Sequence, residues 1–371
     1  MTNLFFYGTL RYQPLLELVL SEPGVELDTV SAELPDHTVR AVANQPFPMV
    51  VPASGKRAQG VLVRGLTASQ IARLNYYEGG FDYDLRPMTV ILEDGSAAEA
   101  QVYFPQEGLW TPGGTWDLES WAAQWGALTL HAAAEVMAFY GRLTPAEIAR
   151  SFRAIRVRAA ARLAAAQRPA NPGRDVSVDV VVENHHRAYV NYFGVDEMDL
   201  RHRRNDGSMS DSLNRRALMT GQASVVLPYD PVRDRVLIVE QFRAPVFMIG
   251  DPAPWMWEAV AGMIDPGETP EQAARRELLE EAHLEARKLE QAGRAYASSG
   301  SSTEFVHLFV ALADILAETD AGGLASEGED IRSHILSFDA LMNLIDTQQI
   351  KDLPLVSLAN WLARHRDRLR A

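Results

Sequence analysis

The chain has no cysteine among its 371 residues, which excludes disulfides and cysteine-based catalysis and agrees with a cytoplasmic protein. It has no uninterrupted apolar run long enough to cross a bilayer. Its net charge of −14 provides no basic excess for broad binding to nucleic acid or anionic membranes. The start, MTNLFFYGTLR, lacks a charged segment before its short apolar run, so we expect no signal peptide.

The length exceeds that of a usual single core, so two domains are expected. A hydrophobic content of 47% with 23% charged residues is typical of a globular protein. The segment Pro169-Ala170-Asn171-Pro172-Gly173 predicts a linker. We therefore expect one domain over 1–168, a linker over 169–174 and a second domain over 175–371.

The most informative stretch is GMIDPGETPEQAARRELLEEAHL, which begins at Gly262. A helix starting near Pro270 would place Glu277, Glu280 and Glu281 on one face. Like charges at this spacing repel, so the helix gains nothing from them unless a cation lies between. Clustered carboxylates are the ligands that Mg²⁺ prefers, together with water and substrate phosphates.

This stretch resembles the Nudix box of hydrolases that cleave nucleoside diphosphates linked to another group. Glu268 and Arg276 match along with the three clustered glutamates, and we expect Arg276 to pair with Glu268 and brace the loop. The family's glycine near the helix end is His283 here, which must adopt a left-handed cap conformation at some cost. The alternative is a solvated acidic surface helix.

The N-terminal half predicts mixed short strands and few helices. We expect a strand over 3–10, helices over 14–20 and 69–77, turn-rich short strands over 30–65, and a hairpin of 89–92 with 100–104. Together they favour a small, strongly curved sheet or barrel.

Two pieces, FFYGTLR and LNYYEGGFDYDLR, resemble the gamma-glutamylcyclotransferase-like family. The resemblance covers about residues 1 to 110. It implies that the turn Tyr7, Gly8, Thr9 and Leu10 offers backbone N–H groups to a substrate, and that Glu78 is a general acid/base. A partly buried carboxyl with a raised pKa suits proton transfer near neutrality. The alternative is that Glu78 braces a loop in a domain without catalysis.

From Trp116 to Arg168 the pattern is helical, with one apolar stripe of Trp121, Trp125 and Leu128. A second helix carries several arginines, which we interpret as a solvated face in so acidic a chain: Arg150, Arg153, Arg156, Arg158 and Arg162.

The C-terminal half predicts strands over 176–183, 188–195, 197–203, 223–228 and 235–240, then the box helix, further strands and a terminal helix over 355–369. This order fits the α/β/α sandwich of Nudix proteins. The fold class is therefore α+β for the small mixed barrel and α/β for the sandwich.

Further pieces of this half resemble the ADP-ribose pyrophosphatases: NDGSMS, VEQFR, WEAVAGMID, ASSGSSTE and SEGEDIRSHIL. The resemblance implies that Mg²⁺, or Mn²⁺ in its place, is held by Glu277, Glu280, Glu281, Glu329 and the carbonyl of Ala261. It implies Glu327 as the catalytic base or water-orienting group. It further implies that Arg243 and Glu304 contact substrate, and that Arg216 and Tyr192 reach the nucleotide from the partner subunit of a homodimer.

These residues also have plainer interpretations. Arg243 could pair with Glu240, Tyr192 could pack on a sheet, and Glu327 to Asp330 could be an exposed acidic loop. The family's Ser-Pro-Gly is Ser298-Ser299-Gly300 here, which leaves fine substrate selectivity open.

The leading hypothesis is a Mg²⁺-dependent hydrolase that converts ADP-ribose to AMP and ribose 5-phosphate. Alternatives are another ADP-sugar or dinucleotide as substrate, a non-catalytic nucleotide sensor, or gamma-glutamyl cyclotransferase activity in the N-terminal domain.

Overall fold

The computed structural model describes residues 2–20, 27–79, 83–319, 321–324 and 328–371. The chain divides into two compact units, residues 1–216 and 217–371, and each is described by itself. No helix among the described residues is both long and apolar enough to span a bilayer. The prediction had placed 175–216 with the C-terminal domain, whereas in the structure this segment packs with the first unit. The domain bounds of 1–168 and 175–371 stay a prediction.

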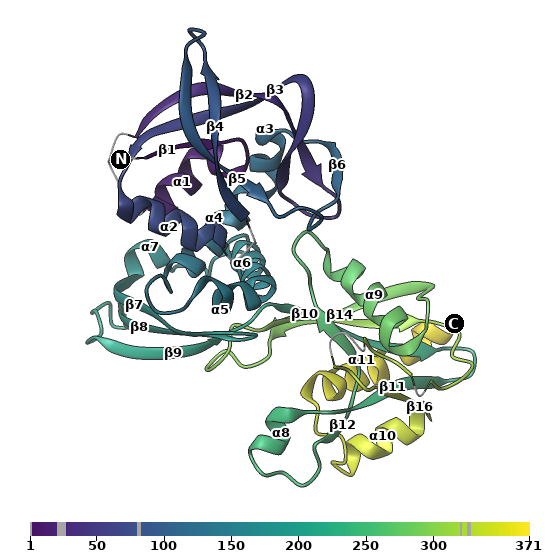
Figure 1. Cartoon of the computed structure of the whole chain (residues 1–371). Helices are drawn as coiled ribbons and strands as arrows, with labels where there is room; N and C mark the ends of the chain where they lie inside the picture. The colour runs from purple at the N-terminus through teal and green to yellow at the C-terminus, as the bar shows by residue number, and fades with distance from the viewer. Residues whose placement is uncertain (1, 21–26, 80–82, 320, 325–327) are drawn as a thin grey trace. The chain divides into compact units, whose positions relative to one another are not determined.

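The first unit begins with a mixed barrel and continues into helices (Figure 1). Its elements are β1 (Thr2–Phe6), η1 (Thr9–Arg11), α1 (Gln13–Leu20), β2 (Asp28–Val42), β3 (Pro48–Leu66), α2 (Ala68–Glu78), β4 (Tyr83–Leu92), β5 (Ala97–Pro105), β6 (Pro112–Thr115), α3 (Leu118–Trp121), a π-helical turn η3 (Ala122–Gly126), α4 (Ala127–Met137), α5 (Pro145–Arg150), α6 (Phe152–Ala166), α7 (Val176–Asp179), β7 (Val180–Val190), β8 (Gly194–His202) and β9 (Leu213–Met219), whose last residues cross into the second unit.

The barrel closes because β3 pairs with both β1 and β2 in the order β3-β1-β5-β4-β2. Side chains alternate along β1: Phe5 joins the core inside the barrel, while Leu4 and Phe6 face the core shared with the helices. This two-residue period is what a strand buried on both faces requires. The predicted small mixed barrel is therefore confirmed.

The prediction of turn-rich short strands over 30–65 was wrong. β2 and β3 form one long antiparallel hairpin, with a register shift between Pro35 and His37. Asp36 adopts a left-handed conformation there, with φ 55°, so the ladder absorbs the proline at a bulge and continues. The prolines of this segment indicated strand ends, but they lie within the strands or at the turn between them.

The second unit is a seven-stranded mixed sheet between helices. Its elements are β10 (Gln222–Asp230), β11 (Arg235–Phe242), α8 (Ala244–Met248), β12 (Trp255–Glu258), β13 (Val260–Met263), α9 (Pro270–Ala282), β14 (Lys288–Tyr296), β15 (Phe305–Leu312), β16 (Arg332–Ser337), α10 (Phe338–Asp346) and α11 (Leu353–Arg370).

Alternating residues of β10 separate the two faces of this sheet. Val225 and Leu227 pack with Leu358 of α11, whereas Val226 packs with Leu278 of α9. One helix layer thus covers each face, which confirms the predicted α/β/α sandwich. The remaining strands of the chain, β7, β8 and β9, form a separate three-stranded sheet. The three strands predicted over 176–203 are in fact α7 followed by the β7–β8 hairpin.

Candidate functional site

Helix α9 begins and ends where the sequence predicts. The hydroxyl of Thr269 accepts a hydrogen bond from the backbone N–H of Gln272 at 3.2 Å, and the Gln272 side chain returns one to the Thr269 N–H at 2.8 Å. This reciprocal cap fixes the first turn. At the other end His283 is left-handed, with φ 52°. The cap position requires this conformation, so His283 adopts it in place of the usual glycine.

The carboxylates of α9 are buried against one another. Only 8% of Glu277 and 1% of Glu281 is exposed. Burial raises the pKa of Glu277 to about 7. Burial, followed by the charge of Glu277, raises the pKa of Glu281 to about 9. The charge of Glu329 acts in the same direction on both. These acids therefore disfavour one another's ionised form, a set that a divalent cation would relieve.

Arg276 braces the loop before the helix. Its guanidinium donates to both oxygens of Glu268 at 3.0 Å and to the carbonyl of Met263 at 3.0 Å. It also reaches Glu277 at 2.5 Å and Glu280 at 3.1 Å. The expected pair with Glu268 is present, and the two-pronged geometry holds the loop to the helix face.

Gly262 is required by the approach of β13 to α9. A Cβ atom at this position would lie 1.7 Å from Oε1 and 2.0 Å from Cδ of Glu277. The neighbouring backbone N–H of Ala261 donates to Oε2 of Glu281 at 3.2 Å. The strand and the acidic helix face therefore meet at Ala261 and Gly262, and the role of the Ala261 carbonyl as a metal ligand stays a prediction.

The late loop returns to the same helix end. The N–H of Gly323 donates to the carbonyl of Glu280 at 3.0 Å, and Oε2 of Glu329 accepts from the N–H of Leu324 at 2.9 Å. Glu327, the predicted base, lies outside the described residues. Within the described part of the chain no group of three acidic or histidine side chains is arranged to hold a metal ion. The oxygen donors and mutual repulsion of Glu277, Glu281 and Glu329 nonetheless suit a hard cation.

Arg243 lies in a second charged group, which the sequence identified only in part. It forms a two-pronged ion pair with Glu258, with Nε to Oε1 at 2.8 Å and Nη2 to Oε2 at 2.5 Å. The alternative partner, Glu240, instead accepts from the indole of Trp257 at 2.9 Å. Glu304 is near enough to Arg243 for the guanidinium to oppose the rise that burial causes in its pKa.

Two acids of this group were not predicted as site residues. Glu258, 7% exposed, ends β12, and its motif WEAVAGMID was the available signal. Burial raises the pKa of Asp352 to about 6, and the charge of Glu258 adds to the rise. Asp352 also caps α11 through the N–H of Leu355 at 2.8 Å, and nothing in its local sequence distinguished it from an ordinary cap.

Tyr192 and Arg216 belong to the first unit, whereas the box carboxylates belong to the second. Tyr192 is 63% exposed on the turn between β7 and β8, with its ring edge-on to Phe193 at 4.8 Å. Arg216 pairs with Glu197 at 3.0 and 2.8 Å. Both side chains lie at the surface of their unit.

The first unit holds a pocket at the predicted turn after β1. It is lined mainly by aromatic side chains and includes all four turn residues and Glu78: Phe5, Phe6, Tyr7, Gly8, Thr9, Leu10, Pro46, Phe47, Pro48, Tyr77, Glu78, Tyr83, Tyr103, Trp121, Thr129, Phe152 and Arg156. The last four come from helices α3, α4 and α6. The structure thus brings together the residues of both N-terminal motifs.

Glu78 is the acid of this pocket. Burial raises its pKa to about 7. Its charge contributes to raised pKa values of Tyr7, Tyr83 and Tyr103, after burial itself. These phenols therefore stay protonated near neutral pH. A carboxyl with this pKa can both accept and donate a proton near neutral pH.

Comparison with known proteins finds a family match within each unit. A model of the NUDIX domain matches residues 219–356. A model described as gamma-glutamyl cyclotransferase, AIG2-like, matches residues 4–120.

Among curated relatives, the ADP-ribose pyrophosphatase of Escherichia coli K12 is 35% identical over 192 residues, which are 52% of this chain and 91% of that protein. The ADP-ribose pyrophosphatase of Haemophilus influenzae is 34% identical over 160 residues, 43% of this chain and 74% of that protein. A GDP-mannose pyrophosphatase of Escherichia coli is 30% identical over 172 residues, 46% of this chain and 88% of that protein. Given a braced acidic helix on an α/β/α sandwich and relatives matched over most of their length, this chain belongs to the Nudix hydrolases and carries a gamma-glutamyl cyclotransferase-like domain before its Nudix domain.

Proposed function

We propose that the Nudix domain hydrolyses ADP-ribose to AMP and ribose 5-phosphate with Mg²⁺. The observation that carries the proposal is the buried acidic face of α9, because Glu277 and Glu281 cost folding free energy that a cation would offset. Two relatives named as ADP-ribose pyrophosphatases support the substrate. The relative named for GDP-mannose shows that similar chains differ in the sugar nucleotide they take.

The cation would be held by Glu277, Glu280, Glu281, Glu329 and the carbonyl of Ala261. It would neutralise charge on the pyrophosphate and lower the pKa of a water molecule. In the reaction a water oxygen attacks one phosphorus, and the bond from that phosphorus to the bridging oxygen breaks. The bridging oxygen leaves with the second phosphorus, as part of a phosphate monoester.

The remaining roles would fall to other residues that the family resemblance singles out. Glu327 accepts the proton of the attacking water or orients it. Arg243, held in place by Glu258, contacts a phosphate, and Glu304 contacts the substrate beside it. Tyr192 and Arg216 contact the nucleotide, and we propose that they do so across a homodimer.

The test is AMP release from a panel of nucleoside diphosphate conjugates with Mg²⁺, comparing ADP-ribose with an ADP-hexose, a dinucleotide and GDP-mannose. ADP-ribose should have the highest kcat/KM. Glu281→Gln is the inactive reference and Glu271→Gln, exposed on the first turn of the same helix, is the matched control. Binding of ADP-ribose without cleavage by the wild-type protein would instead favour the nucleotide sensor.

For the N-terminal unit we propose gamma-glutamyl cyclotransferase activity as a second function. The specific observation is Glu78, with its pKa of about 7, in a pocket with the Tyr7–Leu10 turn. The α-amino group of a gamma-glutamyl amine would attack its own γ-carbonyl, the amide C–N bond would break, and Glu78 would transfer the proton to the departing amine.

This second function is tested by incubating gamma-glutamyl amines with the full chain and measuring release of the free amine. Glu78→Gln should abolish release while leaving AMP release by the Nudix domain unchanged. Equal amine release by Glu78→Gln and wild type would contradict the assigned role, and no release by the wild type would leave Glu78 as a bracing residue.

A further inference from the structure

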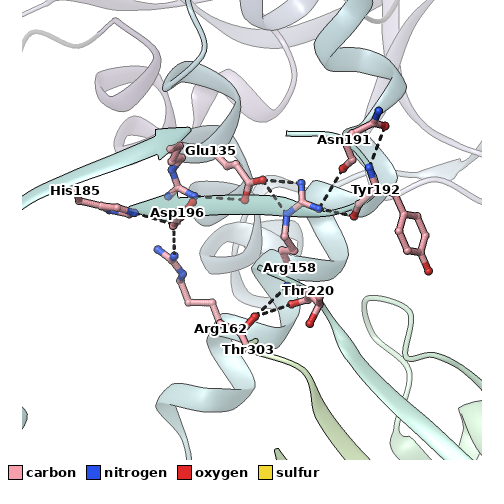
Figure 2. Close-up of polar contacts among 10 residues, drawn as sticks. Glu135, Arg158, Arg162, His185, Asn191, Tyr192, Asp196, Thr220 and Thr303 are labelled. Atoms are coloured by element: carbon pink, nitrogen blue, oxygen red, sulfur yellow. Dashed lines mark hydrogen bonds and ion pairs between the residues drawn. The ribbon is translucent and has the colours of Figure 1, made fainter. Parts of the chain in front are cut away.

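A buried cluster of opposite charges joins the helices of the first unit to the β7–β8 hairpin (Figure 2). At its centre Oε1 of Glu135, on α4, accepts from Nε and Nη2 of Arg158, on α6, at 2.9 and 2.6 Å. Glu135 is 8% exposed and Arg158 6% exposed. The prediction of a solvated arginine face was therefore wrong at Arg158, which points into the unit.

The same guanidinium also holds the turn that carries Tyr192. Nη1 of Arg158 donates to the carbonyl of Tyr192 at 2.8 Å and to that of Asn191 at 3.3 Å. In Figure 2 the Tyr192 ring points away from this contact. Arg158 thus holds the backbone of the turn, while the side chain of Tyr192 stays 63% exposed.

The second half of the cluster secures the two strands. Asp196 of β8, 6% exposed, contacts His185 at 2.7 Å and lies 3.8 Å from both Arg187 and Arg162. Arg187 in turn lies 3.4 Å from Glu135, which links the two acids. Buried ion pairs contribute little net stability compared with apolar packing, but they specify one geometry. This cluster specifies where the hairpin sits on α4 and α6.

These contacts lie in a part of the chain that neither family model covers, between residues 120 and 219. We propose that Arg158 is a positioning residue for nucleotide binding: it holds the Tyr192 turn so that the tyrosine ring meets the nucleotide. The proposal rests on the nucleotide-contacting role of Tyr192 proposed above.

The test uses the full chain and four variants, one of which combines Arg158→Lys with Tyr192→Ala. Arg158→Lys keeps a positive charge beside Glu135 but loses the fork that reaches the two carbonyls. Tyr192→Ala removes the presented ring. Arg162→Lys, one helical turn along α6 from Arg158, is the matched control, because Arg162 contacts Asp196 and not the turn. Thermal melting of each variant checks that the first unit stays folded.

Arg158→Lys and Tyr192→Ala should each raise KM for ADP-ribose about tenfold, or about 1.4 kcal/mol, with kcat changed less than twofold, since the chemistry lies elsewhere. The double variant should be no worse than Tyr192→Ala alone, because Arg158 acts through that ring. Arg162→Lys should leave KM unchanged. A purely structural role for Arg158 would instead lower the melting temperature without changing KM.

Unchanged KM in Arg158→Lys, or additive effects in the double variant, would overturn the positioning role. Unchanged KM in Tyr192→Ala would overturn it through the loss of the nucleotide contact on which it rests. Absence of AMP release by the wild type is a different failure, that of the proposed hydrolase. In that case the same four-way comparison, made with the dissociation constant for ADP-ribose, decides the positioning role.

Discussion

The stability of the first unit should depend on pH through Glu78. Its pKa is raised from an ordinary value of 4.5 to about 7 by burial. Below the lower value the carboxyl is protonated in both the folded and the unfolded chain. Between the two values only the folded chain keeps the proton, so the free energy of unfolding falls as pH rises through this window. Above the higher pKa value the carboxyl is ionised in both states, and the folded state bears the full free-energy cost of burying the charge.

The magnitude follows from the two pKa values. Their difference, 7 − 4.5 = 2.5, corresponds to about 3 kcal/mol at roughly 1.4 kcal/mol for each factor of ten. About 1.4 kcal/mol of this has already been lost at about pH 5.5, so the loss remaining between about pH 5.5 and pH 8 is about 2 kcal/mol. Glu78→Gln cannot ionise and should escape that loss.

The assay is urea unfolding of wild type and Glu78→Gln at those two pH values, with the transition of the first unit assigned by amide hydrogen exchange in α2. The stability advantage of Glu78→Gln should grow by about 2 kcal/mol between the two pH values. The exposed residue Glu119 provides the control Glu119→Gln, whose difference from wild type should stay constant. A pH-independent difference for Glu78→Gln would refute the reasoning, since it would place the carboxyl in a well-solvated environment.

The other predictions concern the Nudix domain. Glu281→Gln should cut turnover at least about a hundredfold with little loss of fold, as measured by AMP release and thermal melting, because it removes one ligand charge from a repelling set. Glu327→Gln should lower kcat while leaving KM within about twofold, and a pure rise in KM would make it a binding residue. Gly262→Ala should lower turnover about tenfold or more, because the new Cβ would displace Glu277; wild-type kinetics would show that the strand can move aside. A mixed dimer of Arg216→Ala and Glu281→Gln parents should regain activity if sites are shared across subunits, and sedimentation showing an active monomer would exclude that arrangement.

The acidic helix was predictable because its signals are local. Thr269 and Pro270 mark the start, and the spacing of the glutamates sets the face, so position along the chain translates directly into geometry. The αL conformation of His283 also followed, since the helix has to end there whatever residue occupies the cap. The reason for a glycine at position 262 is visible only in the structure. A Cβ atom there would clash with Glu277, so no larger side chain is accommodated.

Features that depend on partners far apart in the sequence were missed, because no local signal connects them. Arg158 and Glu135 are 23 positions apart, and Arg158 and Tyr192 are 34 positions apart. No periodicity connects such pairs, and an arginine-rich helix in an acidic chain is more often solvated. Asp352 was similarly hidden, because a helix cap looks the same in sequence whether or not it lies near Arg243.

Helix α6 connects the pocket of the first unit with the turn between β7 and β8. Its residues Phe152 and Arg156 line the pocket that contains Glu78, while Arg158, one half-turn later, holds the Tyr192 turn. Arg158 in turn forms the buried ion pair with Glu135. That pair is costly to break once desolvated. The pocket and the turn therefore share one structural element, and the turn keeps its position only while α6 keeps its own.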